Sequence, residues 1–194
     1  MKNFLAVIAA IAIAMVAGFY IFSEKLPADR SEGKADIGGP FSLIDQDGKV
    51  FTEQNLKGKY SLVFFGFTNC PEVCPTTLME TTEAIKKLGD DAKNLLPIFI
   101  SIDSNDNPTS MKTYLTNFHP SIIGLTGSEE QIKKAAAAYK VYYAKINQPE
   151  SSAGYTMDHS AYVYFMDKDG NYLTHFSYKD PADKIISTVK PYLD

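Results

Sequence analysis

The chain contains two cysteines, Cys70 and Cys74, whose spacing indicates chemistry at sulfur. Three residues separate them, one more than in the Cys-x-x-Cys motif of ordinary dithiol oxidoreductases. Two thiolates at this spacing could hold a soft metal ion such as Cu(I), which prefers sulfur ligands. They could also form a disulfide, but a bond that closes so short a loop stabilises a fold by only about 2 kcal/mol. The pair therefore favours a metal site or redox chemistry over a purely structural bond.

Each cysteine precedes a proline, which restricts the backbone of the residue before it. Pro71 and Pro75 predict a stiff loop, with Pro75 as the first helical residue and Cys74 close to the helix N-cap. The positive end of the helix dipole would then favour the thiolate of Cys74. Cys70 is expected to be the more exposed sulfur and the candidate nucleophile.

A third metal ligand must come from elsewhere, and the chain has three histidines. His119 precedes a proline at the end of a predicted helix, where contact with the last carbonyl groups is expected. His175 lies within a predicted strand, where a half-buried structural role is expected. His159 ends a predicted flexible loop in front of a buried strand, and this loop is expected to face the cysteines. The predicted metal ligands are therefore Cys70, Cys74 and His159.

Other ligand sets are less favoured by the sequence. Structural zinc normally takes four protein ligands, and only three good candidates are present. Met79 and Met157 carry soft thioether sulfurs, but core packing is the expected use of both. Thioredoxin-like oxidoreductases usually carry a cis-proline opposite the dithiol, whereas no proline stands between Pro149 and Ala161. The pattern therefore favours a site of two cysteines and one histidine.

The elements that must position these residues follow from the hydrophobic pattern. A hairpin is predicted around the turn Asp45–Gly48, and the continuous apolar run 60–67 is typical of a central strand. A flexible loop is predicted over 147–158. Further strands are predicted at 97–102, 122–125, 161–166 and 172–178, and helices at 75–88, 108–118, 128–139 and from Pro181 onward. This order predicts an α/β, thioredoxin-like fold, with a mixed central sheet flanked by helices and an N-terminal hairpin.

The N-terminal segment is strongly apolar. The 19 residues from Phe4 to Phe22 carry no charge, and as a helix they span roughly 28 Å, close to the thickness of a bilayer core. Residues 1–22 are therefore expected to form one transmembrane helix that anchors the chain, with a cleaved signal peptide as the alternative. Residues 23–37 are expected to form a flexible tether. Residues 38–194 are expected to form a soluble domain outside the bacterial inner membrane, in the periplasm.

The composition suits one domain with a single core and no nucleic-acid partner. The chain has 194 residues, a formal net charge of −4, twelve Phe, twelve Tyr and no Trp. Its basic residues are scattered, whereas nucleic-acid-binding domains gather theirs on one face.

Three spaced motifs resemble the signature of the Sco/SenC family. They are Phe65-Gly66-Phe67-Thr68-x-Cys70-Pro71-x-Val73-Cys74-Pro75, then Ile100-Ser101-Ile102-Asp103 followed by Phe118-His119-Pro120-x-Ile122-x-Gly124-Leu125-Thr126-Gly127, and finally Asp158-His159-Ser160. The resemblance implies a membrane-tethered, thioredoxin-like copper protein that assists assembly of the dinuclear copper centre of cytochrome c oxidase. It also implies that Cys70, Cys74 and His159 bind copper, as Cu(I) or Cu(II).

The chain departs from the family in one loop. It has Asp103-Ser104-Asn105-Asp106-Asn107-Pro108 where the family often has Asp-Pro-x-Arg-Asp-Thr-Pro. The first proline and the arginine are missing, which leaves partner recognition at this loop open.

The sequence supports a metallochaperone rather than an enzyme, with a redox alternative. As a chaperone, the chain would pass copper to the copper-centre subunit of the oxidase, with a second copper chaperone or a thiol reductase as a further partner. The alternative is a thiol–disulfide oxidoreductase in which Cys70 and Cys74 reduce cysteines of that subunit or of other extracytoplasmic proteins. A redox or copper sensor that acts through protein contact is a third option.

Overall fold

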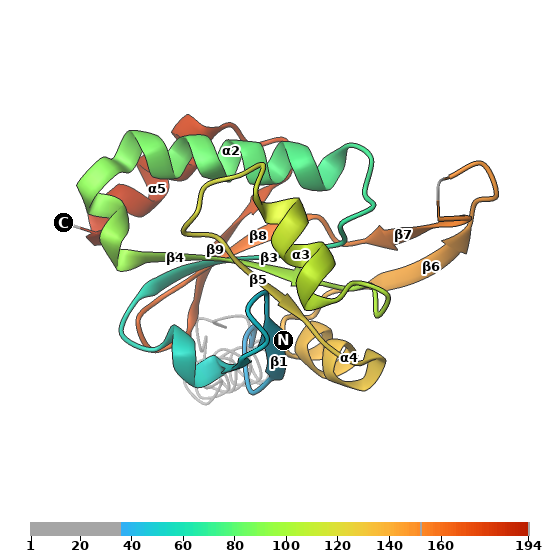
Figure 1. Ribbon diagram of the computed structural model, residues 1–194. Coiled ribbons are helices and arrows are strands. Elements are labelled where there is room, and N and C mark those ends of the chain that lie inside the picture. Colours follow the sequence, from blue (N-terminus) through green and yellow to red (C-terminus); the bar gives the residue numbers. More distant parts are fainter. Residues whose placement is uncertain (1–35, 152, 194) are drawn as a thin grey trace, which may run out of the picture. The chain divides into compact units, whose positions relative to one another are not determined.

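The computed structural model describes residues 36–151 and 153–193, which are coloured along the chain in Figure 1. The predicted anchor, residues 1–22, and nearly all of the predicted tether, residues 23–37, lie outside the described residues. Within the described ranges, no helix combines the length and the apolar character that a membrane crossing requires.

A mixed sheet of seven strands forms the centre of the described domain, in the order β2-β1-β5-β4-β3-β8-β9. Its strands are β1 (Ser42–Asp45), β2 (Val50–Thr52), β3 (Tyr60–Gly66), β4 (Leu95–Ser101), β5 (Ile123–Thr126), β8 (Tyr162–Met166) and β9 (Tyr172–Ser177). β3, β4 and β5 are parallel, whereas β8 pairs antiparallel with β3, and β1 pairs antiparallel with β5. The predicted N-terminal hairpin is confirmed as the antiparallel pair of β1 and β2.

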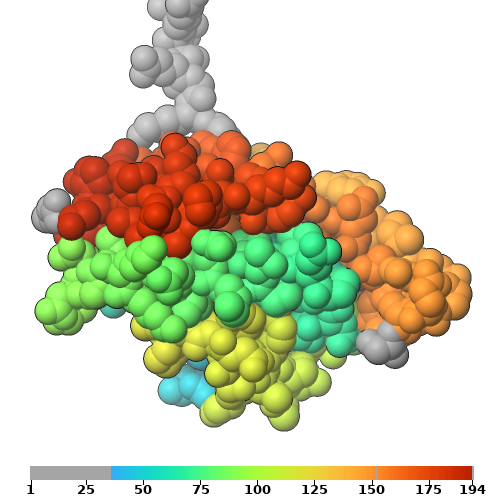
Figure 2. All heavy atoms as spheres, turned by 90° about the horizontal axis from the view of Figure 1, so that it is seen from above, coloured from blue at the N-terminus to red at the C-terminus, as the bar shows by residue number. Residues whose placement is uncertain are grey.

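Helices cover both faces of this sheet. They are α2 (Val73–Leu88), α3 (Pro108–Leu115), α4 (Glu129–Ala138) and α5 (Ala182–Leu193), with two short 3-10 helices, η1 (Glu53–Leu56) and η2 (Gly89–Asn94). α2 and α5 lie side by side (Figures 1 and 2), joined by an ion pair of 3.0 Å between Lys87 and Asp183. α4 lies on the other side of the sheet (Figure 1). Its predicted N-terminus is confirmed, because Ser128 and Gln131 form a capping box.

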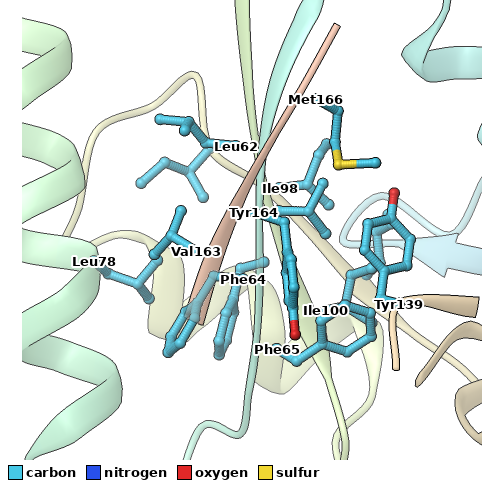
Figure 3. Close-up of a cluster of buried hydrophobic side chains, with 14 of the residues drawn as sticks. Leu62, Phe64, Phe65, Leu78, Ile98, Ile100, Tyr139, Val163, Tyr164 and Met166 are labelled. Atoms are coloured by element: carbon cyan, nitrogen blue, oxygen red, sulfur yellow. The ribbon is translucent and has the colours of Figure 1, made fainter. Parts of the chain in front are cut away.

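The core lies on both sides of β3 because its side chains alternate between two buried faces. Figure 3 shows Leu62 and Phe64 on the side from which Leu78 of α2 projects, whereas Phe65 lies beside Tyr139 on the opposite side. The rings of Phe65 and Tyr139 are 5.3 Å apart. A strand that is buried on both faces needs the continuous apolar run that the sequence contains.

The prediction of a flexible loop over residues 147–158 was wrong in part, because residues 148–154 connect two strands whereas Asn147 and residues 155–158 belong to those strands. β6 (Tyr143–Asn147) and β7 (Tyr155–His159) pair antiparallel along their whole length, from Tyr143 opposite His159 to Asn147 opposite Tyr155. This two-stranded hairpin extends from one end of the sheet in Figure 1 and is the orange projection in Figure 2. The strands escaped prediction because most of their residues are polar or half-buried and show no clear alternation.

Candidate functional site

The two cysteines lie where β3 ends and α2 begins. α2 starts at Val73, so Cys74 lies in its first turn, and the prediction that Pro75 begins the helix was wrong. Proline is tolerated there because the first backbone N–H groups of a helix need no intrahelical partner. The Cys74 side chain is fully buried, whereas Cys70 remains in the preceding loop and is partly exposed. The prediction that Cys70 is the more exposed sulfur is confirmed.

Gly66, the last residue of β3, makes room for the buried sulfur. A β-carbon added at Gly66 would lie 2.7 Å from Cys74 Sγ and 2.8 Å from Cε2 of Phe99. Both distances are far shorter than a van der Waals contact, so a larger residue here requires the sulfur or the ring to move. The sequence analysis gave Gly66 no separate role, although its place in the cysteine motif was a signal for it.

His159, the last residue of β7, reaches the buried cysteine. Its Nε2 lies 3.8 Å from Cys74 Sγ. Its Nδ1 lies 3.1 Å from the carbonyl oxygen of Ser160, an arrangement in which Nδ1–H donates and the lone pair of Nε2 points to the sulfur. The rings of Phe64 and Phe67 flank the imidazole, each with its centroid 6.2 Å away. The prediction that the His159 segment faces the cysteines is therefore confirmed.

The other two histidines lie outside this site, and their predicted contacts were wrong. His119 Nδ1 lies 2.8 Å from the Ser121 hydroxyl rather than on the carbonyl groups of α3. His175 is exposed rather than half-buried, and its ring packs edge-on against Tyr162 with centroids 4.8 Å apart. Neither residue approaches the cysteines through any contact among the described residues.

The two thiols have opposite electrostatic environments. Hydrogen bonding by the Cys74 side chain is the largest effect that lowers the pKa of Cys70, to about 4. The backbone N–H of Cys74 adds to this effect, because it donates to Cys70 Sγ at 3.3 Å. Burial raises the pKa of the Cys74 thiol well above its ordinary value, and hydrogen bonding and charge at Cys70 raise it further. The prediction of a thiolate at Cys74 was wrong, since the first turn of α2 presents its N–H to Cys70 instead.

We expect iodoacetamide to alkylate Cys70 at a nearly constant rate from about pH 6 to about pH 8, because a thiol whose pKa is about 4 is already thiolate there. Toward lower pH the rate should fall as the thiolate is protonated. An ordinary thiol with a pKa near about 8.5 would instead react about ten times faster per pH unit over the same range. Mass spectrometry of samples quenched at timed intervals measures the rate.

The control for this measurement is Cys70→Ser, which leaves Cys74 as the single thiol. Its alkylation should be slow throughout the range, because Cys74 is buried and burial, the largest cause of its raised pKa, does not depend on Cys70. A steep rise in the Cys70 rate between about pH 6 and about pH 8 would contradict the assignment of the thiolate.

A cavity of about 350 Å³ opens beside these residues and is lined by Cys70, His159 and Met157 among others. A second cavity of about 470 Å³ lies against α4 and β6, and Met157 also lines it. Met157 is 9% exposed and belongs to the core, as its predicted packing role requires, whereas Met79 is 60% exposed on α2 and was wrongly expected to pack.

The site fits a soft metal ion after a small rearrangement. Among the described residues, no three His, Cys, Asp or Glu side chains are grouped closely enough to hold a metal as they stand. The separation of 3.8 Å between Cys74 Sγ and His159 Nε2 nevertheless suits two ligands of one ion. With bonds of about 2.3 Å to sulfur and about 2.0 Å to nitrogen, as in zinc sites, it corresponds to an angle of roughly 120° at the metal. Rotation of the partly exposed Cys70 side chain would supply the third ligand.

Comparison with known proteins identifies the family. The family model described as SCO1/SenC matches residues 29–194. The SCO2-like protein of Rickettsia felis is 46% identical over 156 residues, which are 80% of this chain and 76% of that protein. The structure of Bradyrhizobium japonicum ScoI with copper bound is 44% identical and has a TM-score of 0.74, covering 80% of this chain and 99% of that chain.

A second similar structure comes from a protein described as having a disulfide switch. It is that of BsSco, described as a member of the Sco family of cytochrome c oxidase assembly proteins with a disulfide switch. BsSco is 30% identical to this chain, with a TM-score of 0.65, and the match covers 82% of this chain and 95% of BsSco. The mixed α/β, thioredoxin-like fold predicted from the sequence is confirmed. The match over residues 29–194 and the identity to these relatives together show that the chain belongs to the SCO1/SenC family.

Proposed function

We propose that this protein is a copper chaperone that binds one copper ion through Cys70, Cys74 and His159 and assists assembly of the dinuclear copper centre of cytochrome c oxidase. The contact of 3.8 Å between Cys74 Sγ and His159 Nε2 carries the proposal, because it brings a buried sulfur and an imidazole lone pair together. Sulfur and imidazole are the ligands that copper prefers. The copper bound to Bradyrhizobium japonicum ScoI supports the choice of metal.

The three ligands differ in a way that suits delivery of a metal rather than permanent retention. Cys74 is buried at the base of the site, whereas Cys70 lies at the edge of the cavity of about 350 Å³. His159 belongs to a separate two-stranded hairpin. A cysteine or histidine of the copper-centre subunit could enter from the cavity, bind the ion beside Cys70, and replace His159 as the hairpin moves away. The ion would then leave by ligand exchange without ever being free in water.

The rest of the chain is proposed to hold this site at a membrane. Residues 1–22 would form a single-pass anchor and residues 23–37 a tether. Residues 38–194 would form the copper-binding domain on the periplasmic side of a bacterial inner membrane. The apolar run from Phe4 to Phe22 supports this arrangement.

Copper titration of the purified, reduced, full-length protein in detergent tests the proposed function. We expect one equivalent of Cu(I) to bind. The Cu(II) form is expected to show a sulfur-to-copper charge-transfer band and an EPR signal that both change in His159→Ala, because an imidazole ligand has been lost. Binding that is not stoichiometric, or a spectrum that is the same in His159→Ala, would contradict the site.

A thiol–disulfide oxidoreductase is the second candidate, and the asymmetry of the cysteines favours it. An accessible thiolate such as Cys70 attacks a disulfide, and a buried neighbouring thiol such as Cys74 then resolves the mixed disulfide. Two electrons pass from the cysteine pair to the target disulfide, which becomes two thiols while Cys70 and Cys74 become a disulfide. Target reduction that survives in His159→Ala but is lost in Cys70→Ser would favour this function over copper delivery.

A further inference from the structure

The loop between β4 and α3 holds the hairpin that carries His159. The hydroxyl of Tyr155, the first residue of β7, donates to Oδ2 of Asp103. The same hydroxyl accepts a hydrogen bond of 2.8 Å from Nδ2 of Asn105. Oδ1 of Asp103 in turn accepts the backbone N–H of Asn105 at 3.0 Å. Asp103 is only 4% exposed, so its buried carboxylate needs these hydrogen-bond donors.

The far end of the same loop holds the segment that carries the cysteines. Oδ2 of Asp106 accepts the backbone N–H of Thr68 at 3.0 Å, and Oδ1 accepts the Thr68 hydroxyl. The Ser101 hydroxyl also donates to Asp106, at 2.6 Å. Thr68 stands two residues before Cys70. Residues 103–106 therefore join the two separate parts of the chain that supply the metal ligands.

The hairpin needs such a contact because few of its side chains are buried, and among its described residues only Met157 lies in the core. An isolated pair of strands is only marginally stable in water. At its base, the backbone N–H groups of Tyr142 and Ser160 make hydrogen bonds to Ser160 Oγ and to the Tyr142 carbonyl, respectively. Tyr155 stands at the other end of β7, opposite Asn147. The orientation of the strand that ends in His159 is thus set at the base, at the buried Met157 and at Tyr155.

We propose that Tyr155 is a positioning residue whose hydroxyl, held between Asp103 and Asn105, latches the hairpin so that His159 stays within reach of Cys74. The inference rests on the proposed function in one respect, namely that His159 is a copper ligand. Release of the Tyr155 hydroxyl frees the hairpin to pivot about its base, which withdraws His159 and opens the site for transfer. Loop 103–107, which departs from the family pattern, therefore affects metal release through the orientation of His159.

Tyr155→Phe tests the latch because it removes the hydroxyl and keeps the ring, over which Lys145 Nζ lies at 3.6 Å. Protein loaded with one equivalent of Cu(I) is mixed with an excess of bicinchoninic acid, and the rate of copper release is followed by absorbance. A hydrogen bond to a charged group is strong enough that its loss should speed release by about tenfold. Tyr142→Phe is the matched control, since its side chain is 60% exposed beside the same hairpin, and its release rate should equal that of the wild type.

Hydrogen exchange of the metal-free protein separates failure of the latch from failure of the proposed function. In Tyr155→Phe, the amides of β7 should exchange about ten times faster while those of β3 remain unchanged, because only the hairpin is freed. If the wild type binds no copper, the proposed function is wrong, and the exchange measurement still decides whether the latch exists. The latch would be overturned if copper-loaded Tyr155→Phe released copper at the wild-type rate. It would also be overturned if the amides of β7 exchanged at the same rate in Tyr155→Phe as in the wild type.

A second variant keeps the test independent of the aromatic ring. Asn105→Ala removes the donor at 2.8 Å and should also speed copper release. Because both groups belong to one network, the double variant should release copper no faster than Tyr155→Phe alone. If the effects of the two substitutions on copper release were additive, Asn105 would act independently of the Tyr155 hydroxyl, which would contradict the proposed latch.

Discussion

Replacing His159 with alanine is expected to lower the affinity for Cu(I) by more than about a hundredfold. Loss of a residue that merely orients a metal ligand typically costs about 10–100-fold in affinity, so loss of a ligand itself should exceed that range. The substitution leaves Cys70 and Cys74 in place, and the remaining pair would hold copper without the imidazole at 3.8 Å from Cys74 Sγ. Competition against a chelator of known affinity measures the change.

The matched controls are the other two histidines. His175→Ala removes an exposed imidazole that contacts Tyr162, and His119→Ala removes one that contacts Ser121. Both variants should bind copper as the wild type does. Equal losses in all three variants would mean that histidine content rather than this site governs binding, and unchanged affinity in His159→Ala would exclude His159 as a ligand.

Gly66→Ala is expected to damage the fold and the site together. The added β-carbon would lie 2.7 Å from Cys74 Sγ and 2.8 Å from the Phe99 ring, both in the buried core. Overpacking of this kind typically lowers the free energy of unfolding by about 1–3 kcal/mol. Because the sulfur can relieve the clash only by moving, its distance to His159 changes and the affinity for copper should fall. Urea denaturation and copper titration of the same preparation measure both effects.

Gly124→Ala is the control that distinguishes a general loss of fold stability from a specific effect on the candidate copper site. A β-carbon at Gly124 would meet Cγ of Met111 at 2.3 Å and Cδ1 of Leu115 at 2.7 Å, which are side chains of α3 rather than metal ligands. This variant should also unfold at lower urea concentration, but its folded fraction should keep the wild-type affinity for copper. If Gly66→Ala kept that affinity as well, the Cys74 sulfur would not need the space beside Gly66.

Copper delivery and disulfide exchange, the two candidate functions, can use the same two cysteines because Cys70 and Cys74 differ in exposure and in pKa. The Cys70 thiolate is accessible and the Cys74 thiol is buried, an arrangement that serves both the capture of a soft ion and attack on a disulfide. His159 is what distinguishes the two, since disulfide exchange needs no imidazole at 3.8 Å from the buried sulfur. Variants of His159 are therefore more informative than variants of either cysteine.

Local patterns in the sequence predicted the main elements and the residues of the candidate site. The apolar run at 60–67 predicted β3 because a doubly covered strand must be apolar on both faces, and Ser128 with Gln131 predicted the start of α4 because a capping box is a contact between near neighbours. The spacing of the only two cysteines, Cys70 and Cys74, and the position of His159 in front of a buried strand identified the candidate ligands.

Only the tertiary structure decided how those residues are arranged. The thiolate lies at Cys70 because the burial of Cys74 and the N–H groups of α2 act across space, which no spacing rule reports. His159 lies on a strand because β7 pairs with β6, and polar strands carry no periodic signal. Tyr155 meets Asp103 across more than fifty positions of sequence. Contacts of such long range depend on the whole chain being folded, and the positions of the proposed metal ligands depend on those contacts.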